Sequence, residues 1–125
     1  MKSLIKFLFC MCLLLIPTML LASESYYNRL WCEKHNGEVE SIIRGNLVVE
    51  CMTEDMVIET CYAKNIYSSL LVKVLYYSML THKKAGLLLI VNNSSEWNYV
   101  DRLQRIIDYH KLPATLYYIE SETYK

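Results

Sequence analysis

The sequence predicts a mixed α/β (α+β) fold, in which an antiparallel hairpin leads into a β-α-β-α-β tail. Three observations predict it. Residues 38–63 hold three short runs rich in β-branched residues, separated by turn residues. Helical spacing of apolar residues begins near residue 64. The unbroken apolar run at residues 86–91 is typical of a strand covered on both faces, so we expect a mixed sheet with helices on both faces.

The first half of the domain predicts one helix and three strands. Residues 25–35 have the composition of a short helix that packs Leu30 and Trp31 inward, with Tyr27 as a further inward candidate. Asn36 and Gly37 follow, and both residues tolerate the left-handed conformation that ends a helix. Strands are then expected over three ranges, 38–44, 47–52 and 57–63, with the intervening turns at residues 45–46 and 53–56.

The second half predicts two helices and two strands. Between residues 64 and 82, apolar residues recur every three or four positions, as on the inward face of a helix. A buried strand is expected at residues 86–93. Hydroxyl and acidic residues at 94–96 predict the start of another helix, which ends before Pro113. The last strand is expected at residues 114–121, and no repeat or linker indicates a second domain.

Residues 1–24 have the layout of a secretory signal peptide: a basic start, an apolar run at residues 7–21, and small polar residues. A membrane anchor would need roughly 20 apolar residues. The run here is shorter and contains Pro17. We therefore expect cleavage, no stable membrane anchor afterwards, and a single exported domain at residues 25–125, either periplasmic or secreted.

Composition bounds the partners of this domain. Of the 13 basic residues, Lys2 and Lys6 are lost with the signal peptide, which leaves 11 against 13 acidic residues and no basic run. This balance disfavours strong non-specific binding of nucleic acid. The three histidines are far apart and none lies at ligand spacing with another histidine or a cysteine. The partner is unknown from composition, and both nucleic acid and an exported protein remain open.

The second predicted hairpin brings two acidic residues together. A four-residue loop at 53–56 would pair Met52 with Val57, and therefore Glu50 with Glu59. Directly opposed side chains have Cβ atoms about 5 Å apart. Like charges so placed destabilise the hairpin unless a raised pKa, a neighbouring cation or a bound divalent metal neutralises them. A three- or five-residue loop would stagger the pair but could keep it close.

Three cysteines follow the signal peptide, and an oxidising compartment favours one disulfide and one free thiol. Because side chains alternate along a strand, Cys61 shares the face of Glu59, whereas Cys51 points to the other face. A disulfide needs Cβ atoms about 4 Å apart. Cys32–Cys51 is therefore the expected bridge and Cys61 the free thiol. No histidine is placed by the sequence to activate Cys61 as a nucleophile.

Five short segments are informative when taken together: "WC" at 31–32, "NGEVE" at 36–40, "VECMTEDMVIE" at 49–59, "LVKVLYYS" at 71–78 and "KKAGLLLIV" at 83–91. They resemble segments of small exported bacterial proteins related to the PD-(D/E)xK, or restriction-endonuclease-like, nuclease superfamily. The predicted αβββαβ order of elements is also the core of that superfamily. The resemblance spans most of the mature chain.

The resemblance implies a site in which two acidic residues bind Mg²⁺ and a lysine two positions after the second acid activates the attacking water. Glu50 falls at the first acid, where the motif prefers aspartate, and Glu59 falls at the second. Cys61 stands where the lysine belongs, and a thiol cannot replace an ammonium group. Lys73, on the following helix, is the candidate substitute for that cation, and Lys64 is a second candidate.

In some members resembling the recombination nucleases, a glutamine and a tyrosine lie on the next helix. Lys73 falls at the glutamine-like position here, and Tyr77 falls at the tyrosine-like one. These two residues are four apart and therefore share a helix face.

Two functions compete on these grounds. One is an exported protein that keeps the nuclease-like scaffold, has lost or changed its activity, and binds a partner through a tyrosine-rich surface. Candidate tyrosines for such a surface are Tyr62, Tyr67, Tyr76, Tyr117 and Tyr118. The other is Mg²⁺-dependent phosphodiester hydrolysis of nucleic acid in the periplasm or outside the cell, with Glu50, Glu59 and Lys73 as catalytic residues. An unrelated small exported α/β protein is a third alternative.

Overall fold

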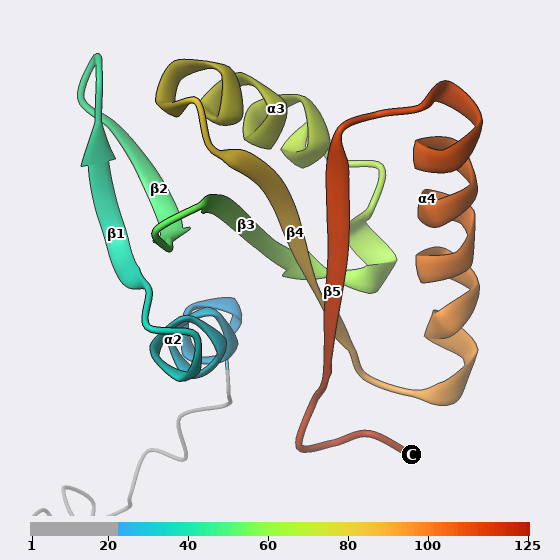
Figure 1. The fold of residues 1–125 in the computed structure, drawn as a ribbon. Coiled ribbons are helices and arrows are strands. Elements are labelled where there is room, and N and C mark those ends of the chain that lie inside the picture. Colours follow the sequence, from blue (N-terminus) through green and yellow to red (C-terminus); the bar gives the residue numbers. More distant parts are fainter. Residues whose placement is uncertain (1–22) are drawn as a thin grey trace, which may run out of the picture.

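The computed structural model describes residues 23–125, which form a five-stranded mixed sheet and three α-helices (Figure 1). The predicted fold class is confirmed. In chain order the elements are α2 (Glu24–Lys34), β1 (Glu38–Ile43), β2 (Leu47–Met52), β3 (Met56–Tyr62), a 3₁₀ turn (Ala63–Asn65), α3 (Leu70–Thr81), β4 (Lys84–Val91), a second 3₁₀ turn (Ser94–Glu96), α4 (Trp97–His110) and β5 (Ala114–Glu120).

The strands lie in the sheet in the order in which they occur in the chain. β1, β2 and β3 form an antiparallel meander, whereas β3, β4 and β5 run parallel to one another. α3 connects β3 to β4 and α4 connects β4 to β5, as parallel neighbours require a crossover. The hairpin followed by a β-α-β-α-β tail is therefore the observed topology.

Helices cover both faces of the sheet. α3 and α4 pack on one face, where the larger apolar core includes Val74, Leu87 and Leu103. α2 packs on the other face, where a smaller core includes Trp31 and Leu88. β4 supplies alternate residues to the two cores and is buried along nearly its whole length, which is why its sequence is an unbroken apolar run.

Some predicted boundaries were wrong. The helix expected from residue 64 begins only at Leu70, because a 3₁₀ turn and a short loop follow β3. The next strand begins at Lys84 rather than at residue 86, since the Lys84 amide donates to the Asp55 carbonyl oxygen at 2.9 Å and extends the parallel ladder. In α2, Leu30 was expected to face inward but is 48% exposed. The inward face is formed by Tyr27, Asn28 and Trp31.

Most of the predicted signal peptide lies outside the described residues, which begin at Ser23. Ser23 is the N-cap of α2, and its hydroxyl accepts a hydrogen bond from the Tyr26 amide at 3.4 Å. Cleavage directly before Ser23 would preserve this cap. Within residues 23–125, no helix has both the length and the apolar character needed to cross a membrane.

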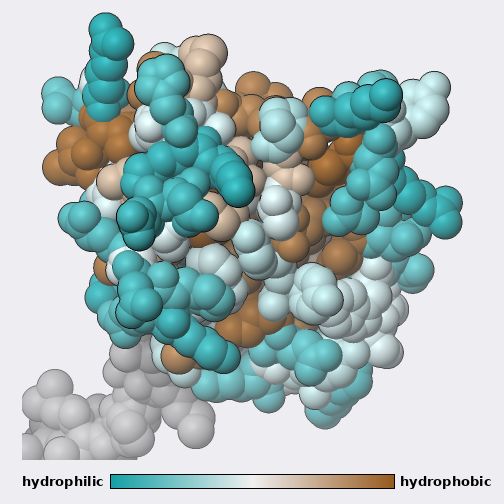
Figure 2. All heavy atoms as spheres, viewed as in Figure 1, coloured by the Kyte–Doolittle hydropathy of each residue, from teal (hydrophilic) through white to brown (hydrophobic). Residues whose placement is uncertain are grey.

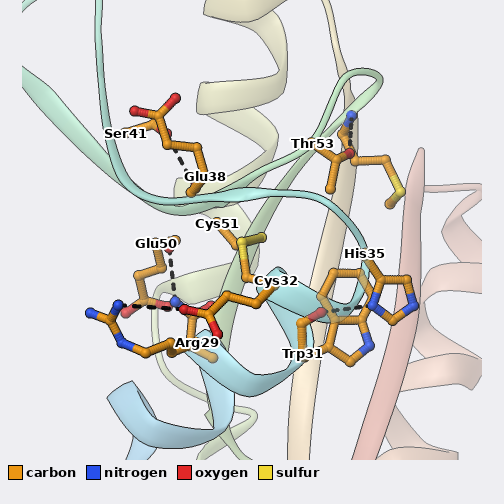
Figure 3. The surroundings of a disulfide bond; sticks show 12 residues. Arg29, Trp31, Cys32, His35, Glu38, Ser41, Glu50, Cys51 and Thr53 are labelled. Atoms are coloured by element: carbon orange, nitrogen blue, oxygen red, sulfur yellow. Dashed lines mark hydrogen bonds and ion pairs between the residues drawn. A yellow bond between two sulfur atoms is a disulfide. The ribbon is translucent and has the colours of Figure 1, made fainter.

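The predicted disulfide is present. Cys32 of α2 and Cys51 of β2 are bonded, with Cα atoms 5.8 Å apart, and both side chains are fully buried (Figure 3). The bridge fixes α2 to the face of the sheet that carries the smaller core. Cys61 is the free cysteine, as expected, and its side chain is buried. A disulfide of this kind is compatible with an oxidising compartment.

Candidate functional site

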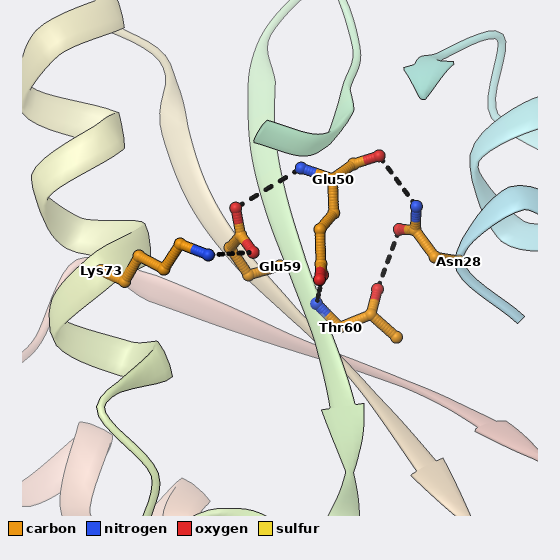
Figure 4. Close-up of polar contacts among 5 residues, drawn as sticks. All are labelled: Asn28, Glu50, Glu59, Thr60 and Lys73. Atoms are coloured by element: carbon orange, nitrogen blue, oxygen red, sulfur yellow. Dashed lines mark hydrogen bonds and ion pairs between the residues drawn. The ribbon is translucent and has the colours of Figure 1, made fainter. Parts of the chain in front are cut away.

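The two glutamates of the hairpin lie side by side on β2 and β3, but they do not form a regular ladder pair. The ladder joins Met52 to Val57 and Cys51 to Ile58, in the predicted register. At the next position the side chains bond to the backbone instead. The Glu50 amide donates to Glu59 Oε1 at 3.4 Å, and the Thr60 amide donates to Glu50 Oε2 at 2.5 Å (Figure 4).

The backbone of Glu50 is likewise irregular toward β1. Val39 pairs with Cys51 and Ser41 pairs with Val49, so that Glu40 lies opposite Glu50 without belonging to the recorded ladder. Glu40 has a φ of 54°, a left-handed conformation that is uncommon outside glycine. The hairpin is thus interrupted at Glu50, and the side chains around it replace the missing backbone hydrogen bonds.

The side chain of Asn28, on α2, replaces another of the missing backbone hydrogen bonds. Its Nδ2 donates to the Glu50 carbonyl oxygen at 2.8 Å, and its Oδ1 accepts from the Thr60 hydroxyl at 2.9 Å. Asn28 and Thr60 are both buried, so their polar groups need these partners within the protein. One amide side chain therefore joins α2 to two neighbouring strands (Figure 4). Sequence reasoning missed Asn28; the only signal was a polar residue three positions before Trp31, on the same helix face.

Lys73 extends from α3 toward Glu59 on the opposite side of the hairpin. Its Nζ lies 3.4 Å from Glu59 Oε2, and the Glu59 side chain has no exposed surface, whereas the Lys73 side chain is 42% exposed. The same Nζ lies 5.6 Å from the centroid of the Tyr77 ring, one helical turn further on. Lys64, the second candidate cation, lies instead over the Tyr62 ring at 5.9 Å. Of the two candidate cations, Lys73 is therefore the one that lies beside Glu59.

Burial dominates the electrostatics of Glu59. Desolvation, and after it the neighbouring Glu50 charge, raise the pKa of the Glu59 carboxyl to about 7, against the opposing effect of Lys73. For Lys73, burial lowers the pKa but Glu59 raises it, and the net direction is upward. Glu59 Oε2 has the ammonium as an ion-pair partner, but no group in residues 23–125 hydrogen-bonds to it in good geometry.

Cys61 lies on the same face as Glu59 and is 6% exposed. Burial raises the pKa of its thiol to about 12, with smaller contributions from the charges of Glu24 and Glu50. The thiol is therefore protonated at neutral pH. It supplies neither the positive charge of the lysine that the resemblance calls for nor a thiolate nucleophile.

The carboxylates of Glu50 and Glu59 can be compared with the ligands that Mg²⁺ requires. Two carboxylates are ligands of the type that Mg²⁺ prefers, but this ion usually retains several waters. Here Glu59 Oε2 faces the Lys73 ammonium, Oε1 accepts the Glu50 amide, and no surface of Glu59 is exposed. A hydrated ion bound to Glu59 would have to displace the ammonium. Within residues 23–125, no group of three or more His, Cys, Asp and Glu side chains is arranged to hold a metal.

One hollow reaches Glu50 but not Glu59. It is a small cavity of about 70 Å³ between α2 and the β1–β2 hairpin. Its lining residues are Glu24, Ser25, Asn28, Arg29, Val39, Glu40 and Glu50. Such a volume accommodates roughly two water molecules at about 30 Å³ each. A nucleotide would not fit within it, and the two glutamates do not share a wall of it.

Comparison with known proteins gives no relative on which to transfer a function. The chain matches no protein-family model, no curated protein and no solved structure. The class defined by fold and site is thus a disulfide-bonded mixed α/β protein with a buried Glu–Lys pair at an interrupted hairpin. The nuclease relationship stays a prediction from the sequence.

Proposed function

We propose that this chain is an exported bacterial protein with a PD-(D/E)xK nuclease-like scaffold, in which the ancestral phosphodiesterase activity has been lost or altered. One observation carries the proposal. Glu59, which corresponds to the second metal-binding acid, is fully buried and is neutralised by Lys73 at 3.4 Å. A carboxylate that is already paired inside the protein has little to gain from a metal ion.

The scaffold part of the proposal is supported by the order of elements. A helix, three antiparallel strands, a helix and a parallel strand follow one another in the chain. This is the αβββαβ order that the resemblance implies. The two glutamates also lie on the second and third strands, where the resemblance puts its acids.

The loss of activity is supported by the position of the motif's lysine. Cys61 carries a protonated thiol there, because burial raises the pKa of the thiol to about 12. Lys73 could provide a cation, but its ammonium is directed at Glu59 rather than at a cavity that holds a substrate. In this proposal the Glu59–Lys73 pair holds α3 against β3 and no longer takes part in catalysis.

A second candidate function is Mg²⁺-dependent hydrolysis of phosphodiesters, with Glu50, Glu59 and Lys73 as its catalytic residues. The observation in its favour is that the Glu50 charge raises the pKa of Glu59, as is expected of two carboxylates that a cation would stabilise. When bound, Mg²⁺ would supply Lewis-acid catalysis and lower the pKa of water. Lys73 would then have to release Glu59.

A nuclease assay separates the two functions. The exported protein is incubated with single-stranded DNA, duplex DNA and RNA, with Mg²⁺ or with EDTA. We expect no cleavage above that of a Glu50→Gln, Glu59→Gln double variant. Mg²⁺-dependent cleavage that is lost in Glu59→Gln would establish the second function. Circular dichroism and intact mass, which reports the disulfide, verify that both samples are folded.

A further inference from the structure

The sheet has two edge strands, β1 and β5, and they differ in how they are protected against further pairing. Edge strands are usually blunted by charges, proline, bulges or short length. β1 carries Glu38 and Glu40, and its ladder is interrupted at Glu40, where φ is 54°. β5 has seven residues in unbroken register with β4, no proline or glycine, and one charge, Glu120, at its end. The edge formed by β5 is therefore unprotected.

The outer edge of β5 carries backbone groups that have no partner strand within residues 23–125. The Ser121 amide donates to the Val91 carbonyl oxygen at 2.9 Å, and this bond fixes the alternation along the strand. The odd-numbered residues of β5 direct their backbone groups to β4, whereas Leu116, Tyr118 and Glu120 direct theirs outward. Figure 1 shows β5 in front of β4, with no other helix or strand in front of it. An added strand could therefore bond along this edge.

The sequence of β5 is complementary to itself under a two-fold rotation. An antiparallel pair centred on Tyr117 would align all seven residues, with Leu116 opposite the partner's Tyr118. Positions 116 and 118 exchange under this rotation, so the outward backbone groups of the two copies face one another. An aliphatic residue opposite an aromatic one stabilises neighbouring strands. Tyr118, which is 58% exposed, would gain a cover in this arrangement.

The charges along β5 favour antiparallel over parallel pairing with a second copy. Glu120 is the only charged residue of the strand, and an antiparallel partner places it opposite an alanine, Ala114. Lys111 is the first charged residue before that alanine in the chain, so the acidic end of one strand approaches a basic group of the other. Parallel pairing in register would instead place two Glu120 carboxylates side by side, which is destabilising.

We propose that the outer edge of β5, an unprotected strand complementary to itself, joins two copies of this chain into a dimer with one continuous sheet. The contact is isologous, because each copy contributes the same residues. Pairing leaves only β1 at the two outer edges of the joined sheet, and the interruption of β1 at Glu40 opposes further growth. The assembly therefore closes at two copies. It does not depend on the nuclease-like ancestry proposed above.

Sedimentation equilibrium over a wide range of concentrations tests the dimer, with protein processed by the exporting cell. We expect a monomer–dimer equilibrium and no larger species. Tyr118→Lys places a charge on the pairing edge and should weaken dimerisation about tenfold or more. Tyr76→Lys is the matched control, because Tyr76 is 48% exposed on α3 beside the β1–β2 hairpin, and it should dimerise like the wild type. Circular dichroism and intact mass verify that each variant is folded with its disulfide.

Hydrogen exchange followed by NMR locates the contact without any substitution. The amides of Leu116 and Tyr118 should exchange more slowly as the protein concentration rises, whereas those of Tyr117 and Ile119, which face β4, should change less. A protein that stays monomeric, larger open-ended assemblies, or a Tyr118→Lys variant that dimerises like the control would each overturn the proposal. A dimer in which the Leu116 and Tyr118 amides are not slowed would overturn it as well. If an unrelated extended peptide slows these amides in a protein that stays monomeric, the edge binds another protein and the proposed dimer is wrong.

Discussion

The Lys73 ammonium lies 3.4 Å from a Glu59 carboxylate that has no exposed surface, and this contact joins α3 to the third strand of the sheet. An isolated charge in such a position would be strongly destabilising. Two responses are visible here: a neighbouring cation and an upward shift of the carboxyl pKa. Both responses offset the burial of Glu59 without requiring a metal ion.

The pH dependence of stability should carry the signature of Glu59. Its pKa is about 7 in the folded protein, above the ordinary value of 4.5. Between these values the folded state binds more protons than the unfolded state, so stability falls as the pH rises through this window. Replacement by glutamine removes this contribution. Urea unfolding from pH 4 to pH 8 should show that wild-type stability declines relative to Glu59→Gln between about 4.5 and 7. Parallel pH profiles would contradict this assignment.

Asn28 should be the most sensitive polar residue of α2. Asn28→Ala leaves the Glu50 carbonyl oxygen and the Thr60 hydroxyl without their buried partner. We expect a loss of about 2–3 kcal/mol in the free energy of unfolding. Asn98→Ala is the matched control, because Asn98 is exposed and makes a single bond of 3.0 Å to the Ser95 carbonyl oxygen. Chemical denaturation of both variants measures the difference, and equal losses would contradict the bridging role.

Gly37 is required by the disulfide beside it. A Cβ atom at this position would lie 2.6 Å from Cys32 Sγ and 2.9 Å from Cys51 Sγ, both closer than van der Waals contact allows. Gly37→Ala should therefore destabilise the protein by about 2 kcal/mol or more, as overpacking does. Gly45→Ala is the comparison, since Gly45 has a φ of 82° and nothing within 4 Å of its Cβ position. We expect about 1 kcal/mol there, from backbone strain alone. If thermal unfolding finds Gly37→Ala to be the milder change, the packing argument is wrong.

Cys61 should be inert in the folded protein. Its thiol is 6% exposed, and burial raises its pKa to about 12, so that hardly any thiolate exists at pH 8. Iodoacetamide should leave the native protein unmodified and should add one carbamidomethyl group after denaturation without a reductant. Mass spectrometry counts the added groups. Rapid modification of the native protein would show that Cys61 is accessible and would reopen a reactive role for it.

The parts of the fold that the sequence predicted are those encoded locally. The turn after Met52 sets the register of β2 and β3, with the Thr53 amide donating to the Met56 carbonyl oxygen at 2.9 Å. From that register and the alternation of side chains, both the Cys32–Cys51 bridge and the free Cys61 follow. The apolar run of β4 likewise identifies a strand buried on both faces.

What could not be predicted depends on contacts between distant segments. The ladder between β2 and β3 ends at Cys51 because Glu50 bonds to α2 and to a side chain of β3. The alternation of apolar and polar residues along one strand does not indicate these contacts. Asn28 lies in a helix whose inward face was assigned from apolar residues alone. A buried polar residue is therefore missed, and Leu30 is placed inward although it is 48% exposed.

The central claim is that Lys73, and not a metal ion, neutralises Glu59. The most direct test is the melting temperature of the wild-type protein and of Glu59→Gln, each with and without millimolar Mg²⁺ or Mn²⁺. A bound ion stabilises the folded state in proportion to the logarithm of its concentration above Kd. We predict no rise in either protein. A rise in the wild type that Glu59→Gln abolishes would contradict the claim and establish a metal site at these carboxylates.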